Sequence, residues 1–323
     1  MRLGLMLNGA RPAPEAVALA RRAEAAGISD VWISEDYFER GAMGVAGAVV
    51  TATETARIGL GVVNPWTRHP MLTAMETAGL DELAGGRFLL GMGASNQVWM
   101  QQRCGIPFSA PLQAVEEAVQ IVRTALASKP VDVAGRHFTV DAALSFVPSR
   151  TAVPIYLGAK GERALALAGR IADGVLLSLL SAPRYVAWAR ERCGVPLDVA
   201  AYVLVSCASD ADRARAEVCR PLAFYLGVHG QHDITAVAGL DAGLAARFRS
   251  GWLSGSPEVD LVDDSLIDTF AVAGDVPGCV AGLQRLAASG LDCAVLRDPG
   301  DDHVEGLFEL AAAYASGGTG RGS

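Results

Sequence analysis

Residues 57–96 constrain the fold of this chain more than any other stretch. The apolar runs at 57–65 and 88–92 read as strands, and the spacing of apolar residues over 70–84 reads as a helix that stops at a Gly-Gly pair. A β-α-β unit of this kind places the carboxyl ends of two parallel strands side by side. That edge of the sheet is where α/β proteins bind their ligands.

The same alternation of strand and helix continues along the chain. Strands are expected at residues 2–7, 30–34, 58–63, 88–92, 154–158, 174–178, 199–206 and 293–297. Helices are expected at residues 14–26, 43–56, 70–84, 112–128, 161–171, 183–192, 211–218, 276–289 and 304–315. Eight nearly continuous apolar strands favour a (β/α)8 TIM barrel. An open doubly wound sheet is the alternative, but no G-x-G-x-x-G follows the first strand.

Two segments interrupt the alternation. Residues 129–153 precede the fifth strand and predict a small hairpin around residues 134–136. Residues 221–270 lie between strands seven and eight and are long enough for a lid with short helices of its own. Neither segment is bounded by a linker. We therefore expect a single barrel domain over residues 1–316 and a disordered, glycine-rich tail over 317–323.

The composition limits the class of protein. The 323 residues are 51% hydrophobic and carry a net charge of −8, so the chain can bury a sizeable core and offers no basic surface for nucleic acid or anionic membrane. No signal peptide or bilayer-spanning stretch is evident. The six cysteines are spread singly and the histidines are not clustered, which indicates reduced thiols and no metal site. These features predict a compact cytoplasmic protein.

Residues 64–95, NPWTRHPMLTAMETAGLDELAGGRFLLGMGAS, carry a resemblance to a known family. They resemble the signature of the luciferase-like flavin and deazaflavin oxidoreductases. Within that family they are most similar to the coenzyme F420-dependent branch that includes methylenetetrahydromethanopterin reductase. The resemblance extends from residue 3 to about residue 296. It implies a TIM barrel that binds F420 and transfers a hydride.

The resemblance assigns cofactor contacts to the ends of the third and fourth strands. Relatives carry a non-prolyl cis peptide after the third strand, and alignment places it at Gly61–Val62, just before Asn64; an ordinary trans strand is the alternative. Small residues that suit close approach to a ring edge follow the fourth strand, namely Gly93, Ala94 and Ser95.

A glycine-rich turn, GAKGER at residues 158–163, follows the fifth strand and opens a helix. Gly158, Ala159 and Gly161 let the backbone fold around an anion, and Lys160 and Arg163 add positive charge. The turn resembles the phosphate-binding turn of the family, which implies that it holds the phosphodiester of F420 or the monophosphate of FMN. A plain turn with Lys160 in solvent is the alternative. Arg297, at the end of the last strand, is a second candidate for the anionic tail of the cofactor.

Two adjacent carboxylates, Glu35 and Asp36, follow the second strand. F420-dependent relatives usually carry Asp-His here, so the resemblance places Glu35 at the acid that contacts the deazaflavin and Asp36 at the histidine. A carboxyl group in a partly apolar pocket can donate a proton near neutral pH. Asp36 is therefore the candidate proton donor, with water as the competitor. The alternative is that Asp36 caps the next helix.

The substrate is less constrained than the cofactor. Met6 stands where the pterin reductases carry a glutamate, and neutral amides replace a charged pair after Ser95. The loss of these charges predicts a substrate other than the pterin. The candidate pocket residues are Met6, Asn8, Trp66, Asn96, Trp99, Tyr225 and His229, each of which could instead be a packing or surface residue.

Three functions follow from these features. The first is an F420H2-dependent reductase that transfers a hydride to a C=N or activated C=C bond of a small molecule or a peptide intermediate. The second is an FMN-dependent luciferase-like monooxygenase, and the third is a non-catalytic flavin-binding protein. The alanine-rich helices are compatible with a homodimer, which is common in the family.

Overall fold

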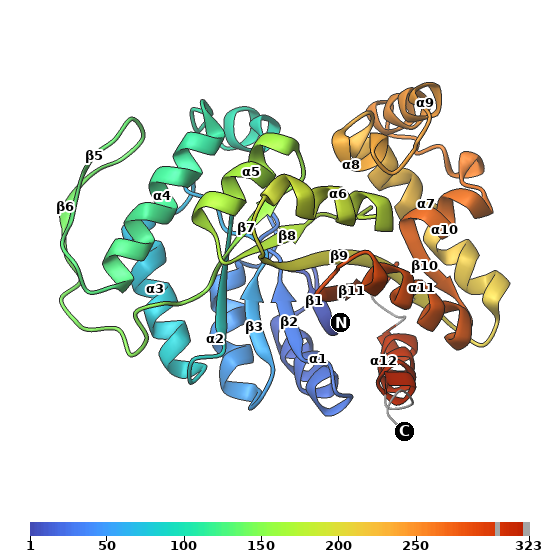
Figure 1. Ribbon diagram of the computed structural model, residues 1–323, viewed down its shortest axis with the longest axis horizontal. Coiled ribbons are helices and arrows are strands. Elements are labelled where there is room, and N and C mark those ends of the chain that lie inside the picture. The colour runs from blue at the N-terminus through green and yellow to red at the C-terminus, as the bar shows by residue number, and fades with distance from the viewer. Residues whose placement is uncertain (301–303, 319–323) are drawn as a thin grey trace.

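Eight parallel strands close into a barrel in the computed structural model, which describes residues 1–300 and 304–318 (Figure 1). The strands are β1 (Arg2–Leu7), β2 (Asp30–Ile33), β3 (Arg57–Leu60), β4 (Phe88–Gly93), β7 (Ile155–Ala159), β8 (Gly174–Leu177), β9 (Asp198–Cys207) and β11 (Cys293–Arg297). They follow the order β9-β11-β1-β2-β3-β4-β7-β8, and pairing of β8 with β9 closes the ring. The predicted (β/α)8 barrel is confirmed.

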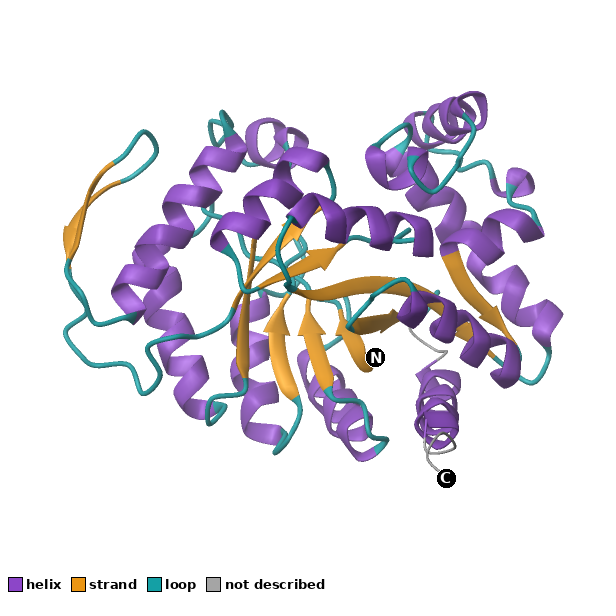
Figure 2. Cartoon of the chain, viewed as in Figure 1, coloured by secondary structure: helices purple, strands orange, loops and turns teal. Residues whose placement is uncertain are grey.

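Helices surround the barrel (Figure 2). Those at the expected places are α1 (Ala13–Ala25), α2 (Ala42–Ala52), α3 (Pro70–Leu83), α4 (Pro111–Leu126), α5 (Glu162–Ile171), α6 (Pro183–Cys193), α7 (Ala211–His229), α11 (Val276–Ala288) and α12 (Val304–Gly318). Each buries an apolar stripe; on α4 the stripe includes Ala114, Val115, Ala118 and Val122. None of the helices in the described residues is long and apolar enough to cross a bilayer.

The predicted hairpin is confirmed as the antiparallel strands β5 (Val131–Ala134) and β6 (Thr139–Ala142). Its tip is tied to the barrel by the Glu117 carboxylate of α4. This carboxylate accepts hydrogen bonds from the backbone N–H groups of Arg136 at 3.1 Å, His137 at 2.8 Å and Phe138 at 3.3 Å.

The second insertion differs from the prediction at both ends. Helix α7 continues through Pro221 to His229, so the excursion begins nine residues later than expected. Proline removes one helical hydrogen bond, but the fully buried Leu222 and Leu226 hold this part of the helix in place. Beyond it come α8 (Asp233–Ala236), α9 (Ala242–Leu253), a 3₁₀ turn at Val259–Leu261, α10 (Asp264–Phe270) and the unpredicted strand β10 (Ala271–Gly274).

Aromatic side chains fill the barrel interior, and each occupies the space beside a glycine of a neighbouring strand. The indole of Trp32 is fully buried, and a Cβ atom added at Gly59 would lie 2.5 Å from it. The ring of Tyr156 occupies the space beside Gly174 in the same way. The two rings meet edge to face with centroids 5.1 Å apart. The glycines of these strands therefore leave room for large side chains from neighbouring strands.

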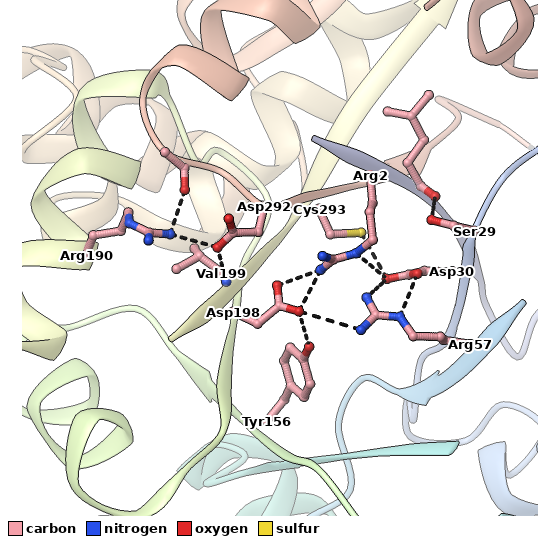
Figure 3. A network of polar contacts seen from close by, with 12 residues as sticks. Arg2, Ser29, Asp30, Arg57, Tyr156, Arg190, Asp198, Val199, Asp292 and Cys293 are labelled. Atoms are coloured by element: carbon pink, nitrogen blue, oxygen red, sulfur yellow. Dashed lines mark hydrogen bonds and ion pairs between the residues drawn. The ribbon is translucent and has the colours of Figure 1, made fainter. Parts of the chain in front are cut away.

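A polar network joins five strands at the amino-terminal end of the barrel (Figure 3). The fully buried Asp30 receives Nε and Nη2 of Arg57 at 3.0 and 2.5 Å. Asp198 receives Nη2 of Arg2 at 2.6 and 2.7 Å and the Tyr156 hydroxyl at 2.8 Å. Burial raises the pKa of Asp198, but the bonds from Arg2 and Tyr156 outweigh it and lower the pKa overall. The carboxylate therefore stays charged.

We expect the Asp30→Asn variant to lose about 1.5 to 3 kcal/mol of unfolding free energy, because the fully buried Asp30 carboxylate accepts charge-assisted hydrogen bonds from Arg57. Urea denaturation measures this loss. Asp264→Asn is the matched control, since Asp264 also binds an arginine but its side chain is 83% exposed; its cost should stay below about 1 kcal/mol. Equal losses in the two variants would contradict a stabilising role for the network.

Candidate functional site

A cavity of about 750 Å³ opens at the carboxyl-terminal ends of β3, β4, β7 and β8. Cofactors occupy cavities of this size. Most of the predicted cofactor residues line it, namely Gly61, Val62, Gly93, Ala94, Ser95, Gly158, Ala159, Lys160, Gly161 and Arg163. The sequence did not point to two further wall residues, Tyr202 of β9 and Asp233 of α8.

The floor of the cavity is built around Val62. The Gly61–Val62 peptide bond is cis, as the resemblance implies. The buried hydroxyl of Tyr202 donates a hydrogen bond to the carbonyl oxygen of Gly61 at 2.9 Å. A Cβ atom at Gly93 would lie 2.5 Å from the Val62 side chain, and one at Gly158 would lie 3.2 Å from it. These glycines therefore leave the space that Val62 fills.

The edge of the floor carries a conformation that is uncommon for its residue type. Ser95 has a φ of 59°, in the left-handed region. Such conformations cluster at ligand sites, where the surroundings impose them. Ser95 follows β4 at the cavity wall, where its backbone can approach a ligand closely.

The predicted phosphate turn forms one end of the cavity. The Tyr185 hydroxyl donates a hydrogen bond to the Lys160 carbonyl at 2.7 Å, which fixes the turn. The Lys160 side chain remains accessible to solvent, but the cavity walls crowd it, and this burial lowers its pKa. Burial and the charge of Lys160 lower the pKa of His229 to about 3 and also lower that of His232.

The helix-capping contact that one alternative assigned to Asp36 is made by Glu35. Glu35 does not line the cavity; its carboxylate accepts a hydrogen bond from the N–H of Ala42 at 2.7 Å, at the start of α2, and lies 3.3 Å from Arg68. The carboxylate that caps the helix is thus Glu35. Asp36 accepts a hydrogen bond from the Ser34 hydroxyl at 2.7 Å.

Asp36 lies close enough to two half-buried tyrosines, Tyr202 and Tyr225, for its charge to act on both. Burial raises the pKa of Tyr202 and Tyr225, and the negative charge of Asp36 raises both further. Arg297 lies on the other side of Tyr225, with its guanidinium carbon 5.4 Å from the ring centroid. These four side chains form the mouth cluster (Asp36, Tyr202, Tyr225 and Arg297), and Tyr202 is the member that also lines the cavity.

Arg297 is therefore not at the phosphate turn. It extends from β11, three strands away from β7 around the barrel. Its Nη1 donates to the Asp298 carbonyl at 3.0 Å, while its buried Nε has no hydrogen-bond partner among the residues that the structure describes. Within residues 1–300 and 304–318 no carboxylate forms an ion pair with it.

Asn64 does not line the cavity and instead makes hydrogen bonds within the turn that follows β3. Its Oδ1 accepts from the N–H groups of Trp66 at 2.9 Å and Thr67 at 3.1 Å, and its amide donates to the Tyr37 hydroxyl. It shapes the turn that follows the cis bond.

The remaining predicted pocket residues do not line the cavity. Trp66 donates through Nε1 to the Ala94 carbonyl at 2.9 Å, and Trp99 packs edge to face on a tyrosine ring. Asn8 and Asn96 accept from backbone N–H groups three residues later, at 3.3 and 3.0 Å. Met6 packs into the barrel interior beside Trp32. Each of these residues makes a local contact, and their part in substrate binding stays a prediction.

Comparisons with known proteins agree with this architecture. A family model described as luciferase-like monooxygenase matches residues 1–293. The 5,10-methylenetetrahydromethanopterin reductase of Methanolobus tindarius is 30% identical over 325 residues, covering 96% of this chain and 98% of the relative. The reductase of the same name from Archaeoglobus fulgidus is 31% identical over 295 residues, covering 86% and 87%.

A solved structure is similar over almost the whole chain. The coenzyme F420-dependent tetrahydromethanopterin reductase of Methanopyrus kandleri superposes with a TM-score of 0.84 at 26% identity, covering 97% of this chain and 96% of that one. The family match, the sequence relatives and the barrel with its glycine-lined cavity lead to one conclusion: the chain belongs to the luciferase-like family.

Proposed function

We propose that the protein is an F420-dependent reductase that transfers a hydride to a C=N or activated C=C bond of a small molecule or peptide intermediate. The observation that carries the proposal is the continuity of the cavity from the Val62 floor to the basic turn at Lys160. A flat ring and an anionic tail need both features in one cavity. The relatives are named reductases, which supports an enzyme over a non-catalytic flavin-binding protein.

The residues of the cavity fit a deazaflavin. Val62 would support one face of the ring, in the position that Gly93 and Gly158 leave open for its side chain. Lys160, Arg163 and the first N–H groups of α5 would hold the phosphodiester. When bound, reduced F420 supplies the hydride. The protein contributes positioning and exclusion of water.

The mouth cluster would receive the substrate. The hydride adds to carbon and leaves charge on the neighbouring atom, which needs a proton to complete the reduction. Asp36 is the candidate donor, because it lies at the strand end close to Tyr202. Arg297, which lies over the Tyr225 ring and whose Nε has no hydrogen-bond partner among the described residues, would bind an anionic group of the substrate.

An FMN-dependent monooxygenase is the second candidate. The description of the matching family model favours it, and the same turn could hold a phosphate monoester. A cytoplasmic location is part of the proposal, and the six free cysteines are in keeping with a reducing compartment.

We expect the Lys160→Ala variant to bind F420 about tenfold more weakly, because a charge-assisted contact to the phosphodiester is lost. A fluorescence titration measures this change. Lys129, the only other lysine of the chain, is exposed beside the hairpin and provides the control Lys129→Ala. Binding of FMN with F420 ignored would favour the monooxygenase. Binding of neither would contradict a cofactor site in this cavity.

The Asp36→Asn variant should reduce substrates about 100-fold more slowly while binding F420 unchanged, since general acid catalysis contributes that much or more. The assay follows oxidation of F420H2 with a panel of cyclic imines and α,β-unsaturated ketones. Asp210→Asn is a control, because this carboxylate caps α7 away from the cavity. An unchanged rate at saturating substrate would identify water as the proton donor.

We also infer that two copies pair through α2 and α3. Leu72, Met75 and Leu83 are 51%, 47% and 58% exposed on α3. Gly79 of α3 and Gly44 of α2 have open space above them, so another helix could approach closely. Exposed apolar surface of this kind marks contact sites between proteins.

A Met75→Glu substitution should convert the dimer to a monomer, because it would place an unpaired charge in the interface. Size-exclusion chromatography with light scattering measures the mass. The control is Val147→Glu, at an apolar residue that is 76% exposed outside α2 and α3. A wild-type protein that elutes as a monomer at micromolar concentration would contradict the inferred interface.

A further inference from the structure

One carboxylate already touches the turn that would bind the cofactor phosphate. Oδ2 of Asp233 accepts a hydrogen bond from the backbone N–H of Glu162 at 3.1 Å. Glu162 is the first residue of α5, and Asp233 is the first residue of α8 in the second insertion. Both residues line the cavity. The contact occupies one of the N–H groups that a phosphate at this helix terminus would use.

The start of α8 lies directly against the turn. A Cβ atom added at Gly161 would lie 3.5 Å from Oδ2 of Asp233 and 3.6 Å from the imidazole of His232. A phosphate held by Lys160 and the first turn of α5 would therefore lie next to the Asp233 carboxylate. A phosphate and a carboxylate that are neighbours in a partly buried site repel each other strongly, because both are negatively charged.

The insertion cannot withdraw this carboxylate easily. Ile234 and Thr235 are fully buried, and the Thr235 hydroxyl donates a hydrogen bond to the Gly230 carbonyl at 2.6 Å. His232 accepts from the N–H of Ile234 at 3.4 Å. Helix α8 is thus anchored beside the turn, and a bound phosphate meets a fixed negative charge.

We propose that Asp233 is a specificity residue that selects a phosphodiester over a phosphate monoester at the α5 turn. A diester carries one negative charge, whereas a monoester carries about −1.5 to −2 at neutral pH. Repulsion by Asp233 penalises the monoester more. The inference rests on the proposed function, because it assigns the charge discrimination between F420 and FMN to the cavity described above.

The test is a set of fluorescence titrations of F420, FMN and riboflavin with the wild type, Asp233→Asn and Asp241→Asn. The Asp233→Asn substitution removes the charge but keeps an oxygen that can accept the Glu162 N–H. Asp241 is the matched control, since its carboxylate caps α9 through the N–H of Leu244 at 2.9 Å and does not line the cavity.

We expect Asp233→Asn to strengthen FMN binding about tenfold, F420 binding only about three- to fivefold because its diester carries about half to two thirds of the charge, and riboflavin binding not at all. The Asp241→Asn control should leave the dissociation constants of F420, FMN and riboflavin unchanged. Equal gains for FMN and riboflavin, equal gains for FMN and F420, or weaker FMN binding would each overturn the proposal. Failure of the wild type to bind F420 would contradict the proposed function, while the comparison of FMN with riboflavin would still decide the role of Asp233.

Discussion

The network of Arg2, Asp30, Arg57 and Asp198, built around the fully buried Asp30, is the interaction on which the rest of the barrel depends. Each of these residues begins a strand or lies next to its beginning, so the network joins the strands at one end of the ring. The opposite end has glycines at Gly61, Gly93 and Gly158, which leave the space that Val62 and Tyr202 fill beneath the cavity. Closure secured at the amino-terminal end permits a hollow at the carboxyl-terminal end.

The sequence predicted those parts of the molecule that local pattern determines. Apolar runs bounded by glycine and proline placed all eight barrel strands, and the GAKGER turn placed Lys160 at the cavity. Strand β10 escaped prediction because four small residues after a helix give no periodicity. Helix α7 was expected to end before Pro221. It continues to His229 because burial of its C-terminal half compensates for the hydrogen bond that the proline removes. Tyr202 and Asp233 reach the cavity through tertiary placement, for which single-sequence patterns carry no signal.

The adjacent pair Glu35 and Asp36 shows the same limit at the level of single side chains. Alternation along an extended backbone predicts that only one of them faces the mouth. Which one does so depends on partners far away in sequence, namely Arg68 and the start of α2, which engage Glu35. The resemblance assigned the contact with the deazaflavin ring to Glu35, whereas in the structure Glu35 caps the start of helix α2.

Strand β9 connects the barrel to the second insertion. Its ten residues pair first with β8, then with β11 and finally with β10, so one continuous strand belongs to the barrel and to the insertion. The strand pairing therefore joins the base of the insertion to the barrel. Substitutions in the insertion can alter the cavity wall at His232 and Asp233 without breaking the ring of barrel strands, so the region offers positions at which specificity can change.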